Sequence, residues 1–134
     1  MILELITSVS FQLRLEPIGS DDRFPSVAFR VEANMDMPSW RATLIAKECW
    51  FSYQSLNDFE AALKELIRKS VGIASLVELG GSSTVTITKN EDALSTEINM
   101  QDTMNCGTSK ITVNGFASEI TEIIEKLREY PKWW

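Results

Sequence analysis

The sequence predicts an α+β domain in which two antiparallel β-meanders are each followed by an amphipathic helix. Segments with alternating apolar and polar residues occur in two groups, and each group precedes a segment whose apolar residues have helical spacing. At 134 residues the chain is long enough for one domain with one core. We therefore expect residues 1–134 to form a single domain, with residues 131–134 as a possible loose tail.

The first group contains three predicted strands. Apolar residues alternate with polar ones from Val9 to Leu15, from Val27 to Met35, and from Trp40 to Ala46, and the last strand continues to Phe51. The segment EPIGSDDRFP, with two prolines and a glycine, separates the first two strands, and MPS follows the second. Short turns between such strands predict antiparallel neighbours.

The first helix is predicted to begin at Ser55, whose hydroxyl can cap free backbone amides, and to end near Gly72. Trp50, which precedes this helix, is expected to pack beneath it rather than to form a ligand platform. Helical spacing predicts one buried face, made of Leu56, Phe59, Leu63, Leu66 and Ile67.

The second group contains four shorter predicted strands and a closing helix. The strands are expected at Ile73–Leu79, Thr84–Thr88, Leu94–Met100 and Lys110–Asn114. The Gly80-Gly81-Ser82-Ser83 segment is expected to form a hairpin turn, because no helix or lysine follows it as a phosphate-binding loop requires. The last helix is predicted to start near Ser118 and to stop at Pro131, with a buried stripe of Ile120, Ile123, Ile124 and Leu127.

The sequence contains few residue patterns that could form a catalytic site. The chain has no histidine, so a histidine general base and the usual nucleophilic triads are excluded. Carboxylate pairs such as Asp21-Asp22, Glu91-Asp92 and Asp58 with Glu60 lie in turns or at a helix start, where acids serve solvation and capping. We expect no enzyme, no cofactor and no metal site, and an enzyme that uses paired carboxylates stays the third hypothesis.

The two cysteines and the charge balance bear on compartment and partners. Cys49 and Cys106 are far apart, without C-x-x-C spacing, and are expected to be reduced, half-buried thiols in strands. The formal net charge of −6 disfavours nucleic acid and favours a cationic protein partner, above all along residues 73–116. The first residues do not resemble a secretory signal and no apolar run is long enough for a bilayer, so a cytoplasmic protein without membrane contact is expected.

One ordered set of residues resembles a known family. It comprises Trp50-Phe51, Ser55, Leu56, Phe59, Leu63 and Leu66, then Gly72, Ala74 and Leu76, then strands and a closing helix. The set, over roughly residues 27 to 130, resembles the immunity proteins paired with the wall-associated polymorphic toxins of bacteria. The family often has a polar D-Q-S-like step before its last helix, where this chain has Phe116-Ala117-Ser118 and matches only at Ser118. The element order also looks like the Whirly single-strand DNA binders, but a basic, aromatic-bearing sheet face is not evident.

The resemblance implies a non-catalytic inhibitor that binds a cognate toxin domain and blocks its active site or substrate path. An acidic surface would attract a basic toxin such as a nuclease. The alternative is a non-catalytic ligand-binding or assembly module, and either a monomer or a homodimer is compatible with the sequence. The candidate partner-binding residues are six acids and two terminal aromatic anchors: Asp21, Asp22, Glu91, Asp92, Glu97, Asp102, Trp133 and Trp134.

Overall fold

The computed structural model describes residues 2–101, 104 and 106–132, and it confirms the predicted α+β fold class. The first meander has four strands, β1 (Leu3–Thr7), β2 (Phe11–Asp21), β3 (Ser26–Asp36) and β4 (Arg41–Ser52), and helix α1 (Tyr53–Arg68) follows it. The second meander contains β5 (Val71–Val77), β6 (Ser83–Asn90), β7 (Ala93–Gln101) and β8 (Thr108–Phe116), and helix α2 (Glu119–Glu129) follows it.

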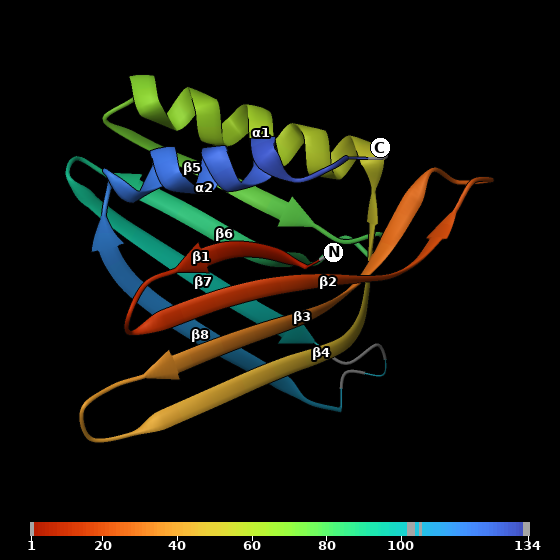
Figure 1. Cartoon of the computed structure of the whole chain (residues 1–134), viewed down its shortest axis with the longest axis horizontal. Coiled ribbons are helices and arrows are strands. Elements are labelled where there is room, and N and C mark those ends of the chain that lie inside the picture. Colours follow the sequence, from red (N-terminus) through yellow and green to blue (C-terminus); the bar gives the residue numbers. More distant parts are fainter. Residues whose placement is uncertain (1, 102–103, 105, 133–134) are drawn as a thin grey trace.

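The strands form two separate antiparallel sheets. Sheet A has the order β1-β2-β3-β4 and sheet B the order β5-β6-β7-β8. Sheet A lies in front of sheet B in Figure 1, and the two helices run side by side along the upper side of the molecule. Helix α1 follows sheet A but packs against β5 of sheet B, whereas α2 follows sheet B but packs against β1 of sheet A. The helices therefore close the side of the molecule where β1 and β5 end the two sheets.

One cluster of buried apolar side chains joins both sheets and both helices. Its largest members include Phe29 and Phe51 of sheet A, whose ring centroids lie 6.2 Å apart. Full burial of each large apolar side chain contributes roughly 1.5–3 kcal/mol, so this cluster is the main source of stability. Other fully buried members are Phe11, Leu13, Leu15, Phe59, Leu63, Leu66, Leu76, Ile87 and Ile98.

The start of the first meander differs from the prediction. Strand β1 was not predicted, because a register shift between Glu4 and Ile6 interrupts its two-residue alternation. Val9 is not a core residue of a strand: it lies in the β1–β2 turn and is 99% exposed. Trp40 likewise lies in the turn before β4 rather than in the strand itself. Alternation predicts strands only where no bulge or turn residue interrupts it.

Helix α1 begins three residues earlier than the capping pattern predicts. Its N-cap is Ser52, whose hydroxyl accepts a hydrogen bond from the backbone N–H of Ser55 at 3.0 Å. Four of the five residues predicted for its buried face are buried, but Ile67 is 53% exposed. Gly72 does not end the helix; it lies in β5, against the side chain of Leu66.

Trp50 does not pack beneath α1. In the β3–β4 register it pairs with Ala28, on the outer face of sheet A, and its ring lies 3.9 Å from the position of a β-carbon at Gly19. The register shift in β4 between Ala46 and Cys49 reverses the alternation, so Phe51 points into the core instead. Small residues on the two neighbouring strands make room for the half-buried indole.

Candidate functional site

The outer face of sheet A is the richest arrangement of charged side chains in the described part of the chain. The register aligns Glu4 of β1, Arg14 of β2 and Glu32 of β3 in one row across the sheet. Alternate residues of a strand point to opposite faces, so the apolar neighbours of these residues form the core while the charged side chains face outward. The row therefore carries opposite charges on adjacent strands.

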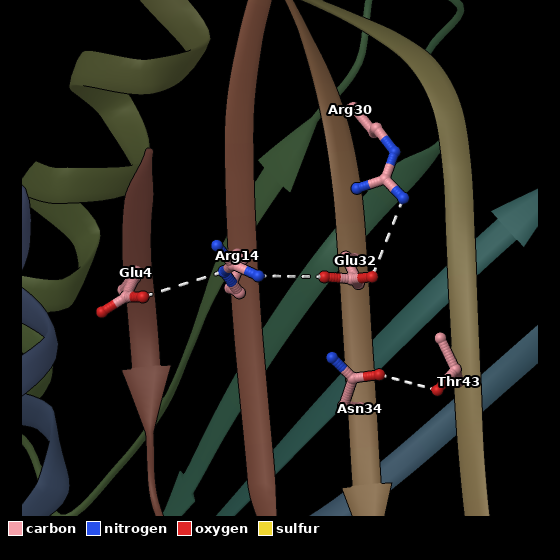
Figure 2. Close-up of polar contacts among 6 residues, drawn as sticks. All are labelled: Glu4, Arg14, Arg30, Glu32, Asn34 and Thr43. Carbon is pink, nitrogen blue, oxygen red and sulfur yellow. Dashed lines mark hydrogen bonds and ion pairs between the residues drawn. The ribbon is translucent and has the colours of Figure 1, made fainter. Parts of the chain in front are cut away.

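Ion pairs connect three of the four strands, as Figure 2 shows. Arg14 Nη1 lies 3.4 Å from Glu32 Oε2, and Arg14 Nε lies 3.8 Å from Glu4 Oε1. The other oxygen of Glu32 lies 3.7 Å from Arg30 Nη2. Along the same face, the Thr43 hydroxyl donates to Asn34 Oδ1 at 2.7 Å. One carboxylate thus holds two guanidinium groups in place.

The ion pairs of this network contribute more to fixing side-chain positions than to the free energy of folding. The Arg14 and Arg30 side chains are each 37% exposed, and ion pairs at such positions typically contribute about 0–1 kcal/mol. The Glu32 side chain between them is only 18% exposed. The network fixes the positions of long side chains that would otherwise rotate freely, which lowers the entropy cost of using them in binding.

Exposed apolar side chains lie at both ends of sheet A, in or next to its turns. At the β2–β3 end, Ile18 is 50% and Phe24 57% exposed, beside the half-buried Trp50, whose indole N–H donates to Glu48 Oε1 at 2.8 Å. At the β3–β4 end, Trp40 is 51% exposed. Tryptophan and arginine are the residue types most enriched where protein interfaces derive their binding energy. The face is therefore suited to contact another protein.

The size of the face agrees with this interpretation. Four strands of 5, 11, 11 and 12 residues, at about 3.3 Å per residue and a spacing of about 4.8 Å, give a surface of about 600 Å². A protein–protein interface of standard size covers about 800 Å² on each partner.

The structure separates the acidic residues predicted from the sequence. Asp21 pairs with Ser26, which in turn pairs with Ser52 at the start of α1, and Asp22 follows in the β2–β3 turn. The backbone N–H of Glu91 instead bonds to Ser70 O at 2.7 Å, just beyond the end of α1. Because α1 has 16 residues, these two positions lie about 24 Å apart along its axis. The predicted acids do not form one continuous surface.

The remaining predicted residues lie elsewhere. Asp92 adjoins the start of α2, since its carbonyl accepts a hydrogen bond from the Ala117 backbone at 2.9 Å. Glu97 lies on the outer face of sheet B and pairs with Lys110 at 3.5 Å. Of the five predicted acids that the structure describes, Asp21 and Asp22 alone adjoin the outer face of sheet A. The other three predicted residues, Asp102, Trp133 and Trp134, lie outside the described residues.

The cysteines have different environments. Cys49 is buried in β4 and Cys106 is exposed between β7 and β8, so the two are not bonded to each other, and the prediction of two strand residues is wrong for Cys106. Burial, with smaller contributions from Glu78 and Glu48, raises the pKa of the Cys49 thiol to about 11. The Cys49 thiol is therefore protonated at neutral pH.

Residues 2–101, 104 and 106–132 contain neither a metal-binding cluster nor a helix that could span a membrane. Within these ranges no group of three or more His, Cys, Asp or Glu side chains is close enough to hold a metal ion. Neither described helix is both long and apolar enough to cross a membrane.

Sequence reasoning missed the residues of the ion-pair network. The signal was present, because Arg14, Arg30 and Glu32 occupy polar positions in alternating strands. Which of them meet, however, depends on the register between strands.

Comparison of the chain with protein-family models, with curated proteins and with solved structures gave no match. The function must therefore be inferred from the geometry of the surface and from the resemblance noted above.

Proposed function

We propose that this protein is an immunity-type inhibitor, which binds a bacterial toxin domain through the outer face of sheet A and blocks its active site or substrate path. The observation that carries the proposal is the ordered row of Glu4, Arg14 and Glu32 across three strands, joined by Arg30. Inhibition by such a surface requires complementary contacts and no bond-making step.

Alternating charges on a flat face favour one partner over others. A partner that places an acid opposite each arginine and a base opposite each carboxylate gains contacts, whereas a shifted or unrelated surface meets like charges. The side chains around Glu32 are already ordered, so little conformational entropy is lost on binding. These features support a specific interface.

The charge of the whole chain supports a basic partner. The net charge of −6 attracts a cationic domain over distances comparable to the Debye length and raises the association rate at low salt. Asp21 and Asp22, at the β2–β3 end of the proposed face, add to this attraction. A nuclease-type toxin, whose substrate is a polyanion, has the required charge.

The test is co-expression with the toxin domain encoded by the neighbouring gene. We expect the wild-type chain to restore growth and to co-purify with the toxin. Arg30→Glu should weaken binding by at least about tenfold and abolish rescue, because it reverses a charge beside Glu32. The matched control is Lys110→Glu, the same charge change on the outer face of sheet B, which should stay within about threefold of the wild type.

Circular dichroism melts should show that both variants remain folded. The proposed function is wrong if the wild-type chain neither protects cells nor co-purifies with the toxin. Loss of rescue with Lys110→Glu, but not with Arg30→Glu, would instead place the interface on sheet B.

A further inference from the structure

Among the described residues, no helix or further strand covers the side of the molecule opposite the helices. There β4 ends sheet A and β8 ends sheet B, so each strand has one edge without a strand neighbour. A groove of about 530 Å³ lies where the two strands approach each other. Its lining consists of Leu44, Ile45, Lys47 and Glu48 of β4, Met100 and Gln101 at the end of β7, and residues 107–109 at the start of β8 and just before it. Backbone N–H and C=O groups along such strand edges need hydrogen-bond partners.

The core is incompletely covered on this side. Leu44 of β4 and Ile111 and Val113 of β8 pack against the core but are only half-buried. Equivalent residues of inner strands, such as Val31 and Ile98, are fully buried. An additional strand that starts in the groove beside Leu44 and continues along the free edge of β8 would cover this apolar surface.

The two edges differ in how they are protected against strand pairing. Strand β4 has a register shift between Ala46 and Cys49, and Lys47 lies within it; both features are common protections of edge strands. Strand β8 also contains a lysine, Lys110, but it has no such shift, since its register with β7 is continuous from Thr108 to Phe116. It contains one charged residue and no proline. Strand β8 is therefore the edge that can accept a new strand, and β4 forms the opposite wall.

We propose that this groove binds an extended segment of a partner polypeptide, which adds to β8 as a fifth strand of sheet B. The segment would have about five to six residues, the usual length of a strand, and no proline. Its alternate side chains would be apolar, to pack against Leu44 and Met100, and the others polar, to face solvent beside Lys110. This surface is distinct from the outer face of sheet A and does not depend on the proposed toxin binding.

A lone segment fits the groove better than a second copy of the chain. In any copy, β8 is flanked by its own β4, which lines the same groove. Two copies joined through β8 would bring both β4 strands into the space between them. A free strand or tail of another protein has no such flanking element.

The probe is a synthetic peptide with the sequence of residues 108–116, TSKITVNGF. When it lies antiparallel to β8 in the register centred on Thr112, all nine residues are paired, Ile111 lies opposite Val113, and Lys110 opposite Asn114, without like charges in contact. The control is the same peptide with alternate backbone amides N-methylated on the pairing edge, which removes the hydrogen-bond donors and keeps the side chains.

Binding is measured by isothermal titration calorimetry and by NMR of the labelled protein. We expect one peptide per chain, shift changes along β8 and β4, and slower amide exchange in β8. Ser109→Lys, which places a charge in the groove, should weaken binding at least tenfold. Thr112→Lys puts the same charge on the opposite, solvent-facing side of the same strand and should change binding less than threefold.

Three results would overturn the proposal: no saturable binding at about 1 mM peptide, equal binding of the N-methylated peptide, or shift changes away from the groove. A dimer in sedimentation experiments that Ser109→Lys dissociates would also overturn it, because the groove would then belong to a second copy. None of these measurements involves a toxin, so they are independent of the co-expression test.

Discussion

Replacement of Gly72 by alanine tests how closely β5 approaches helix α1. A β-carbon at this position would lie 2.7 Å from Leu66 Cδ2, closer than real β-carbon contacts. Leu66 cannot move away easily, because its side chain is 1% exposed and its carbonyl accepts a hydrogen bond from Lys89 Nζ at 2.7 Å. The added methyl group must therefore displace packed atoms.

The expected loss of stability follows from two opposing effects. Overpacking of a core typically costs about 1–3 kcal/mol. Alanine also restricts the unfolded chain more than glycine does, which offsets about 0.4–1 kcal/mol. We expect Gly72→Ala to lower the free energy of unfolding by about 1–2 kcal/mol, which shifts a urea midpoint by roughly 0.5–1 M. Gly107→Ala is the control, since a β-carbon there meets nothing within 4 Å, and it should be neutral or slightly stabilising.

A double-mutant cycle identifies the contact. Leu66→Ala alone should cost about 2–5 kcal/mol, since the residue is buried. With Leu66 truncated, Gly72→Ala should lose most of its cost and leave a coupling energy of about 1–2 kcal/mol. Urea unfolding followed by circular dichroism measures all four proteins. Full stability of Gly72→Ala, or additivity of the two changes, would refute the close packing of β5 against α1.

Three further predictions concern packing, a turn and pH. Phe51→Ala should cost about 3–5 kcal/mol in urea unfolding, and Trp50→Ala clearly less, because Phe51 is fully buried and Trp50 lies on the outer face; equal losses would contradict this placement. Glu91 has a φ of 56°, so Glu91→Gly should stabilise by up to about 1 kcal/mol, whereas Asp92→Gly in the same turn should not. Burial raises the pKa of Glu60, but its bonds to the ammonium groups of Lys132 and Lys64 outweigh this effect, so the pKa is lowered from 4.5. The ionised carboxylate therefore stabilises the fold above that pH, and this stability is lost as the pH falls through the lowered pKa. In urea unfolding at a series of pH values, Glu60→Gln should lose less stability on acidification than the wild type.

The parts of the fold that follow from local sequence were predicted correctly. The four residues proposed for the buried stripe of α2 are all buried, and the helix begins beside Ser118 as expected. Both the buried stripe and the start of the helix depend only on the local spacing of apolar residues along a few helical turns. Strands β2 and β3 were found for the same reason, over the parts where their alternation is regular.

Bulges explain the errors in individual residues. A register shift in β1 hid that strand, and one in β4 turns Trp50, which was expected to pack beneath α1, to the outer face. A bulge inserts one residue without a local sequence signature, and every side chain beyond it changes face. The alternation before the bulge therefore gave the wrong face for Trp50.

The candidate site could not be found from the sequence because it depends on contacts between distant residues. Glu4, Arg14 and Glu32 meet only through the registers of two strand pairs. The acidic residues gave a misleading signal for a similar reason. Acidic residues are frequent in turns. The two acidic turns at opposite ends of α1 have a similar composition, but they lie far apart in the fold.

The two outer sheet faces differ in chemistry, and the connected charges of sheet A favour it as the proposed interface. The outer face of sheet B carries short hydroxyl side chains, such as Thr86 and Thr88, one ion pair between Glu97 and Lys110, and the exposed apolar side chains of Val71, Ile73 and Phe116. Sheet A instead holds Arg14 and Arg30 against Glu32, whose side chain is 18% exposed, so its charges lie in defined pairs. In the proposed function a partner completes these charge contacts, whereas the segment proposed to bind beside β8 would use backbone contacts that do not depend on them.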